Sequence, residues 1–228
     1  YCTQNGVQIR QAVATELCIQ EQAVTGVRCD DGTEYFSQHV VIACGGMSYP
    51  ATGSTGDGYR LAQQAGHTVT ELRPSLVSLV ANGKDCPALQ GLSLKNVAIH
   101  VTDTKQKKEI YDDFGEMMFT HYGVTGPMIL SASSHMRNME PNRYQISIDL
   151  KPALSLEQLD KRLQKDFAEN QNKDFINSLG TLLPRKLIPI MVAKSGIAPN
   201  QKCNQITKEQ RRRFAQELKG FNVMIKGF

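Results

Sequence analysis

The residues with the greatest potential for ligand chemistry lie between 43 and 58. Two adjacent glycines, Gly45 and Gly46, follow the apolar run at 40–43. A strand that is buried on both faces and ends at a turn has this pattern, and bare backbone lets another group approach closely. Hydroxyl side chains follow at Ser48, Thr52, Ser54 and Thr55. Together these residues predict a site for an anionic, phosphate-bearing ligand.

A tight turn is the structural alternative for Gly45 and Gly46 considered alone. The density of glycine and hydroxyl residues favours a ligand site, because a generic turn needs only one or two of them. The pattern that follows predicts a helix over 56–65, with Asp57 in its first turn. A carboxylate there either stabilises the helix end or faces a ligand hydroxyl.

A second candidate group precedes Gly126 and Pro127. Proline suits the first position of a helix, so we expect a helix from 127 to 136. His121 and Tyr122 come just before it. Imidazole titrates near neutral pH, which makes His121 the best candidate in the chain for a proton donor or acceptor. The alternative is a structural histidine whose hydrogen bonds are satisfied.

The elements expected around the first group are short antiparallel strands. Asp30, Asp31 and Gly32 predict a hairpin turn. Strands are expected at 7–10, 13–19, 24–29, 33–36, 40–43 and 67–70.

The pattern changes at Arg73-Pro74-Ser75. Short strands with regular turns follow, and they suggest a small closed barrel. The strands are expected at 76–80, 97–102, 109–111, 116–120 and 144–150, and a final strand at 221–225 would complete the barrel. From Ser155 the apolar residues recur at helical spacing, and Gln158 stands where a capping-box partner belongs. Further helices are expected at 175–179, 184–193 and 207–219.

These expectations give an α+β fold of two domains. The first domain spans 1–74 and holds the meander and the strand-turn-helix. The second spans 75–228, with a barrel over 75–150 and 220–228 and a helical subdomain over 151–219.

Two motifs resemble one protein family. The run from Ala43 to Tyr59 and the run from Phe119 to Pro127 are similar to motifs of the YhiN/BaiN-like, or aminoacetone oxidase-like, bacterial flavoproteins. Cys44 replaces the usual threonine of the first motif, and Thr125 replaces the serine of the second. The resemblance covers essentially the whole chain.

The resemblance implies an NAD(P)/FAD-dependent oxidoreductase acting on a small organic substrate by hydride transfer. Residues 1–74 would be part of an FAD-binding domain, into which the barrel with its helical subdomain is inserted. The expected cofactor contacts are Val13, Ala43, Cys44, Gly45, Gly46, Ser48, Thr52 and Ser54. His121 and Tyr122 would lie over the ring face as catalytic residues.

The same resemblance implies that the chain is a piece of a longer protein. The family's N-terminal Gly-x-Gly-x-x-Gly unit and its C-terminal segment are both missing from this sequence. FAD is therefore expected in the intact protein, whereas the 228-residue chain alone is expected to retain little FAD and to be inactive.

Composition sets further bounds. The chain has 40% apolar and 21% charged residues, and its net charge of only +4 is too small to argue for nucleic acid by itself, so we expect no nucleic-acid partner. No apolar run is long enough to span a bilayer, and no signal peptide is visible. The six cysteines form no Cys-x-x-Cys pair, so we expect no metal site. Core positions are expected for Cys18, Cys29 and Cys44, because they lie in apolar, strand-like segments. A chain of this length does not need disulfides, so we expect a reducing cytoplasmic setting.

A binding module is the rival interpretation. The barrel and its helices could recognise RNA or a protein, with the glycines merely structural. The dense basic run from Lys208 to Arg213 would carry RNA binding, but an exposed helix face is the usual explanation of such a run, and RNA contact would call for more basic residues with aromatic residues between them. A hydrolase using Ser48 or Ser54 is a third interpretation, but no Gly-x-Ser-x-Gly elbow is present.

Overall fold

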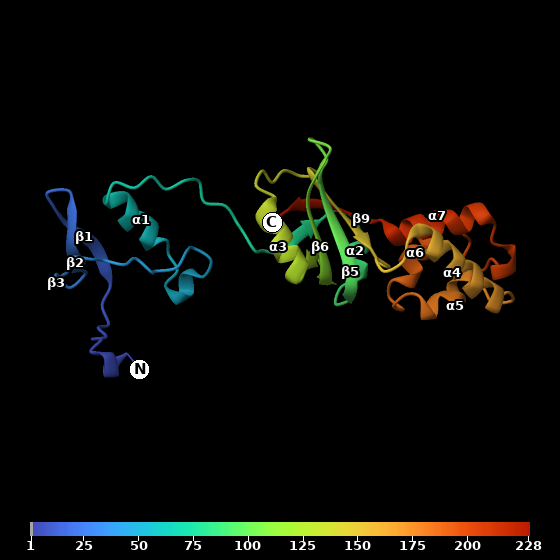
Figure 1. Cartoon of the computed structure of the whole chain (residues 1–228), viewed down its shortest axis with the longest axis horizontal. Helices are drawn as coiled ribbons and strands as arrows, with labels where there is room; N and C mark the ends of the chain where they lie inside the picture. The colour runs from blue at the N-terminus through green and yellow to red at the C-terminus, as the bar shows by residue number, and fades with distance from the viewer. Residues whose placement is uncertain (1) are drawn as a thin grey trace. The chain divides into compact units, whose positions relative to one another are not determined.

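The computed structural model describes residues 2–228. The chain forms two compact units, an N-terminal unit that ends at Leu72 and a C-terminal unit from Arg73 to Phe228. Figure 1 shows the helices and strands of each unit.

A three-stranded antiparallel sheet and one α-helix form the N-terminal unit. The sheet has the order β1-β2-β3. Its elements are η1 (Thr3–Asn5), β1 (Ala14–Gln20), β2 (Ala23–Cys29), β3 (Glu34–Phe36), η2 (Pro50–Thr52) and α1 (Asp57–Gln64). The predicted turn at 30–32 is confirmed, with Gly32 at φ +81°. The β1–β2 turn was not predicted, because Glu21 and Gln22 both take positive φ without being glycine.

Helix α1 is fixed to the free edge of β1. The Gln64 side chain accepts a hydrogen bond from the Leu17 amide at 2.9 Å and donates one to the Leu17 carbonyl at 3.1 Å. Arg60 donates to the carbonyl of Thr15. These bonds satisfy backbone groups of an edge strand that has no further strand beside it.

Three strands predicted in this unit are wrong. Residues 7–10, 40–43 and 67–70 have no strand partner and are irregular. In the apolar run at 40–43, Val40 is half-buried and the other three residues are exposed, Val41 to 87%. Apolar residues buried in this unit are Leu17, Cys29 and Leu61. The apolar pattern of 40–43 therefore lacks the neighbours that would make it a central strand.

A closed six-stranded barrel forms the first part of the C-terminal unit, with the order β4-β7-β6-β5-β8-β9. The strands are β4 (Leu79–Ala81), β5 (Ser93–Asp103), β6 (Lys108–Phe119), β7 (Gly123–Thr125), β8 (Tyr144–Asp149) and β9 (Phe221–Gly227). Helix α2 (Asp85–Ala88) follows β4, and α3 (Pro127–His135) follows β7. Strand β9 closes the ring by pairing with both β8 and β4, as predicted.

Within the barrel, one strand replaces two predicted ones. Segments 109–111 and 116–120 belong to the single strand β6, and Gly115 lies inside it. A Cβ on Gly115 would contact the Met128 side chain of α3 at 3.4 Å, so the glycine makes room for helix packing. Strand β7 was not predicted, because it has three residues and begins with glycine. The mixed fold class itself is confirmed.

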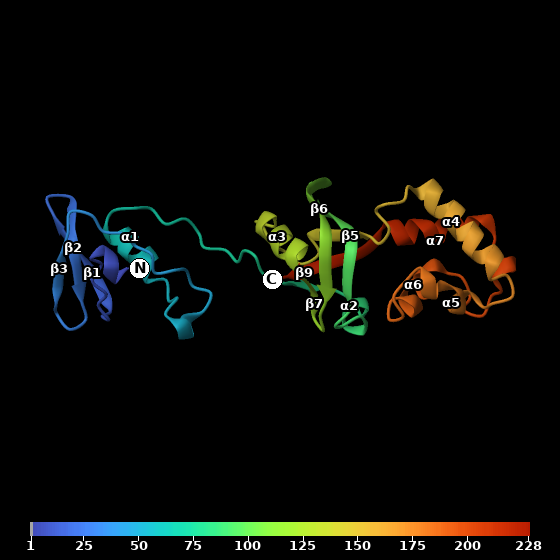
Figure 2. The same ribbon diagram turned by 60° about the horizontal axis from the view of Figure 1, so that its bottom comes forward.

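The helices between β8 and β9 lie on the side of the barrel away from α3 (Figures 1 and 2). They are α4 (Leu156–Glu169), α5 (Phe175–Ser178), η3 (Leu179–Thr181), α6 (Ile188–Ser195), η4 (Cys203–Gln205) and α7 (Lys208–Lys219). The predicted Ser155–Gln158 capping box is present. Helix α6 begins at Ile188 rather than at Pro184, because 184–187 forms a separate turn. Among residues 2–228, no helix is long and apolar enough to cross a membrane.

A two-bond ion pair joins α4 to α7. Arg211 donates to the Asp160 carboxylate at 2.8 and 3.1 Å, and the two side chains are only 13% and 19% exposed. The Arg211 hydrogen bond lowers the pKa of Asp160. We expect Arg211→Gln to lower the free energy of unfolding by about 1.5 kcal/mol at neutral pH, measured by urea unfolding followed by circular dichroism.

The pH dependence of this loss has a definite sign. The folded pKa of Asp160 lies below its unfolded value of about 3.9, so the contribution is present above that pH and is lost as the pH falls through the folded pKa. The penalty should therefore shrink at about pH 3. Arg162→Gln is the control: it breaks a more exposed pair with Asp166 and should cost about 0.4 kcal/mol. Equal penalties at both pH values would contradict the assignment.

Candidate functional site

The glycine segment, Ala43–Gly46, packs against the first turn of α1. A Cβ on Gly58 would lie 3.2 Å from Cγ2 of Ile42 and 3.8 Å from Cβ of Cys44. The helix can approach this closely only because residue 58 has no side chain. Gly45 has φ +74°, a conformation that favours glycine. Glycine is therefore required here both by close packing and by backbone conformation.

The positions that a Cβ would take on Gly45 and Gly46 correct one detail of the prediction from sequence, namely what a larger side chain would meet there. A Cβ on Gly45 would meet Oγ of Ser54 at 3.3 Å, and a Cβ on Gly46 would meet the Tyr59 hydroxyl at 3.3 Å. The first groups that a side chain would meet thus belong to this chain rather than to a ligand. The open surface of the segment is formed by Ala43, Cys44 and Gly45, all of which are exposed. Cys44 is therefore not the core residue that was predicted, because the run at 40–43 is not a buried strand.

The hydroxyl residues of the loop after the segment have different roles. The Tyr49 carbonyl accepts hydrogen bonds from the Thr52 amide at 3.0 Å, the Thr52 hydroxyl at 2.9 Å and the Ser54 amide at 3.3 Å. Thr52 thus shapes the loop. In the part of the chain that the structure describes, the hydroxyls of Ser48 and Ser54 have no hydrogen-bond partner, so both can bond to a ligand.

The N-terminus of α1 keeps backbone donors available. Its N-cap is Gly56, at φ +87°, and no side chain caps the helix. Asp57 bonds instead to the Thr55 hydroxyl and to Arg60 at 3.4 Å, and these bonds, that of Thr55 first, lower its pKa. The Asp57 carboxylate is therefore held beside its own helix.

Val13 lies directly before β1. Its carbonyl accepts a hydrogen bond from the Asp30 amide at 3.0 Å, and its side chain is 60% exposed. The backbone of Val13 is thus used by the sheet, while its side chain remains available.

In the C-terminal unit, His121 and Tyr122 lie in the tight turn between β6 and β7. The Thr120 amide donates to the Gly123 carbonyl at 2.8 Å, and the Thr120 hydroxyl accepts from the Gly123 amide at 3.0 Å. Both rings are exposed, and their centroids lie 4.8 Å apart in an edge-to-face arrangement. The turn therefore presents an imidazole and a phenol side by side to solvent.

The other residues of this motif build the barrel. Phe119 and Val124 are buried, and Ser78 donates to the Thr125 hydroxyl at 2.7 Å. A Cβ on Gly123 would lie 2.0 Å from the Leu79 carbonyl oxygen. This role of Gly123 could not be predicted from the motif, because the contact is with β4, far away in the chain.

Matches to family models decide the family. Residues 1–134 match the HI0933-like protein Rossmann domain, and residues 73–228 match the HI0933-like protein barrel and H2TH domain. The chain belongs to the HI0933-like family. The predicted family resemblance is therefore confirmed.

Three curated relatives of the chain carry two different enzyme names, a reductase and a dihydrouridine synthase. The chain is 28% identical over 182 residues to the 3-dehydro-bile acid delta(4,6)-reductase of Clostridium scindens, covering 79% of this chain and 44% of that protein. It is 29% identical over 180 residues to the ribosomal RNA dihydrouridine synthase of Haemophilus influenzae, covering 78% and 41%. It is 27% identical over 228 residues to the enzyme of the same name from Escherichia coli, covering 99% and 53%. The chain thus spans about half the length of the curated relatives it matches.

Proposed function

We propose that the complete protein is an FAD-dependent oxidoreductase that reduces a carbon–carbon double bond in a carbonyl-bearing ring. The observation that carries this proposal is the exposed glycine segment, which leads through a glycine-rich loop to an α1 N-terminus without a side-chain cap. The names of the relatives support the ring chemistry, since a delta(4,6)-reductase and a dihydrouridine synthase both saturate ring double bonds.

The residues of the N-terminal unit fit a dinucleotide cofactor. No side chain of the glycine segment is larger than that of Cys44, so a flat molecule can lie against it. The Ser48 and Ser54 hydroxyls and the first amides of α1 offer donors to oxygen atoms of the cofactor. The exposed apolar side chains of Val41 and Ile42 would be covered by the remainder of the dinucleotide-binding domain. We accordingly expect the 228-residue chain alone to retain little FAD.

His121 is the proposed proton donor. FAD, when bound, supplies hydride-transfer chemistry, with NAD(P)H as the proposed electron donor. Saturating a double bond next to a carbonyl also requires one proton. The imidazole of His121 is exposed and has no hydrogen-bond partner among residues 2–228, so it is available to hold that proton at a ring nitrogen. Tyr122 offers an aromatic edge against which a ring substrate can pack.

Stopped-flow flavin absorbance of the complete protein tests this proposal. NAD(P)H should bleach the flavin without oxygen, and a 3-oxo steroid with conjugated double bonds or a uridine-containing RNA should restore its colour. His121→Asn should slow the restoration about 100-fold, because a positioned general acid typically contributes that much. Bleaching by NAD(P)H should be unchanged.

His100→Asn is the matched control. His100 lies on β5 and pairs with Glu109 at 3.2 Å, so its loss should leave both rates unchanged. If neither acceptor restores the colour, the ring-reductase proposal is wrong. If the control variant slows the restoration as much as His121→Asn, the assignment of the proton to His121 is wrong.

A further inference from the structure

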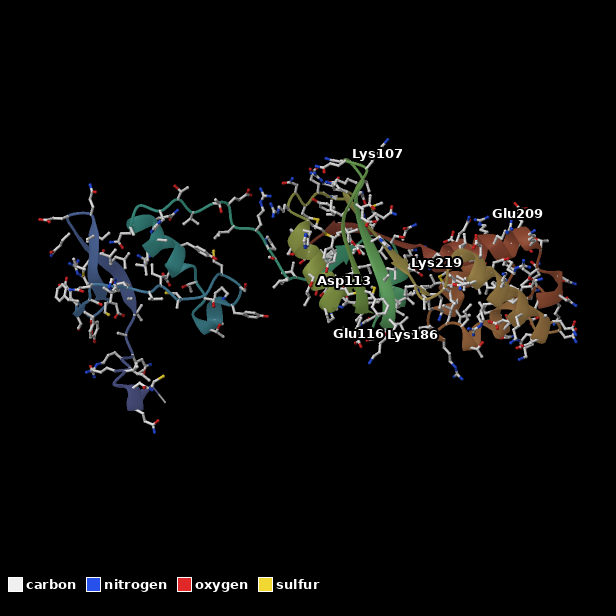
Figure 3. All side chains as sticks on the ribbon, in the orientation of Figure 1. Lys107, Asp113, Glu116, Lys186, Glu209 and Lys219 are labelled. Atoms are coloured by element: carbon white, nitrogen blue, oxygen red, sulfur yellow. The ribbon has the colours of Figure 1, made fainter. Side chains whose placement is uncertain are left out.

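The outward face of α7 carries a basic hollow. Lys208, Glu209, Arg212, Arg213 and Gln216 line an open depression of about 580 Å³, which we call the α7 hollow. All five side chains are exposed, and Figure 3 shows Glu209 on the outer side of the helix. Positions 208, 212 and 216 form one i,i+4 row, and 209 and 213 form the neighbouring row, so all five share one helix face.

The cations of the α7 hollow lie close together without carboxylate partners among the described residues. Several other cations of this helical region are paired: Arg162 with Asp166, Lys194 with Asp85, Lys202 with Asp174, Arg211 with Asp160 and Lys219 with Asp149. Within residues 2–228, Lys208, Arg212 and Arg213 form no ion pair. The lining of the hollow thus holds three cations without an ion pair in the described part of the chain and one carboxylate, that of Glu209. The net charge of the whole chain, +4, does not indicate this local excess of positive charge.

One residue that lines the hollow, Arg213, packs against a neighbouring helix end. A Cβ on Gly196 would lie 3.5 Å from Nη1 of Arg213, so the guanidinium rests against the turn that ends α6. Gly196 is the C-cap of α6, with φ +71°. The C-terminal end of a helix attracts a cation, which holds Arg213 in place before any partner binds.

We propose that the α7 hollow binds the phosphate backbone of an RNA, and that this RNA carries the ring to be reduced. The choice of RNA among polyanions rests on the proposed function. Lysine and arginine neutralise phosphates, and the Gln216 amide can bond a ribose hydroxyl. A membrane surface fits poorly, because Phe214, Ala215 and Leu218 are buried and α7 presents no apolar face.

Fluorescence anisotropy of a labelled, uridine-containing RNA hairpin with the complete protein tests this inference. Lys208→Gln, Arg212→Gln and Arg213→Gln are combined in one variant. Each lost phosphate contact should lower the slope of log K against log salt by about 0.8, so affinity should fall about 100-fold at about 0.1 M salt. Glu209→Gln should act in the opposite direction and strengthen binding about threefold at the same salt concentration.

A matched control removes the same charge elsewhere in the C-terminal unit. Lys107, Lys108 and Lys226 are exposed, and Figure 3 places Lys107 at the tip of the β5–β6 hairpin, away from α7. The triple change of these lysines to glutamine should alter affinity less than threefold, because they make no direct phosphate contact.

Several outcomes would overturn the inference. They are absence of hairpin binding by the unmodified protein, an equal loss in the control variant, and α7-dependent binding to phosphatidylserine vesicles without binding to the hairpin. Flavin bleaching and its reversal by the steroid are measured on the same samples. If those steps are intact and RNA binding is absent, only the α7 inference fails, whereas loss of the flavin steps with RNA binding intact removes the proposed function instead.

Discussion

Gly123→Ala is expected to destabilise the barrel severely. The added Cβ would lie 2.0 Å from the Leu79 carbonyl oxygen and 2.8 Å from the Ala81 amide nitrogen. Both are backbone atoms of β4, which pairs with β7 at this position and closes the ring. They cannot rotate away as a side chain would, so β4 and β7 would have to separate.

The expected loss is about 4 kcal/mol or more, at the upper end of single-residue effects. A domain of this size has only about 5–15 kcal/mol of stability, so the variant would lose a large part of its stability. Urea unfolding followed by far-ultraviolet circular dichroism measures the loss, since the chain has no tryptophan to report by fluorescence.

Gly180→Ala is the control for this prediction. Gly180 lies in η3, and a Cβ there would meet no atom within 4 Å. We expect a change of less than about 1 kcal/mol, because surface substitutions away from special features are usually small. A Gly123→Ala protein as stable as Gly180→Ala would show that β4 and β7 are not so closely apposed.

Gly46→Val is expected to remove flavin from the complete protein while leaving it folded. The Cβ itself would meet only the hydroxyl tip of Tyr59, at 3.3 Å, and that side chain can shift. The two further methyl groups would fill space beside the glycine segment, where we propose that the cofactor lies. Flavin bound to the purified protein, measured by absorbance after denaturation, should fall to less than about a tenth, which for a tightly bound flavin requires an affinity loss of several kcal/mol.

Two companion variants separate a blocked cofactor from a displaced tyrosine. Tyr59→Phe removes the hydroxyl that the new side chain would meet, and alone it should leave flavin content nearly unchanged. Gly46→Val combined with Tyr59→Phe should still lack flavin. If the double variant regains flavin, residue 46 acts through Tyr59 and does not border the cofactor. Gly180→Val serves as the general control and should keep its flavin.

The parts of the fold that sequence analysis predicted correctly depend on local signals. The capping box of Ser155 and Gln158, the turn at 30–32 and the proline at the start of α3 each lie within a few residues of the feature that they determine. Such signals are complete in the sequence itself. The family resemblance was available for the same reason, because both motifs are short and contiguous.

The errors concern residues whose partners lie elsewhere. The run at 40–43 has the composition of a buried strand, but a strand forms only beside another strand, and none pairs with it here. Glycine is typical of turns, but Gly115 lies inside β6, where its lack of a side chain makes room for Met128 of α3. The requirement for glycine at 123 depends on Leu79, whose approach cannot be read from the motif around it.

In the candidate site, too, local features could be predicted from the sequence, whereas contacts between separate segments could not. The type and density of residues from 43 to 58 indicated a ligand site, and the exposure of Ala43–Gly45 agrees with an open surface there. Sequence could not indicate that Thr52 bonds to Tyr49, or that α1 packs on the segment through Gly58. Likewise, Lys208–Arg213 was predicted as one basic run, whereas Arg211 is held by Asp160 and faces away from the hollow.

The flavin content of the complete purified protein tests the central claim most directly. The absorbance spectrum and the released cofactor, identified by chromatography, give the ratio of FAD to protein chain. We predict a ratio of about one, because a flavoenzyme of this kind does its chemistry on a bound cofactor. A well-folded, colourless protein that takes up no FAD when it is supplied would contradict the assignment of the glycine segment and the function built on it.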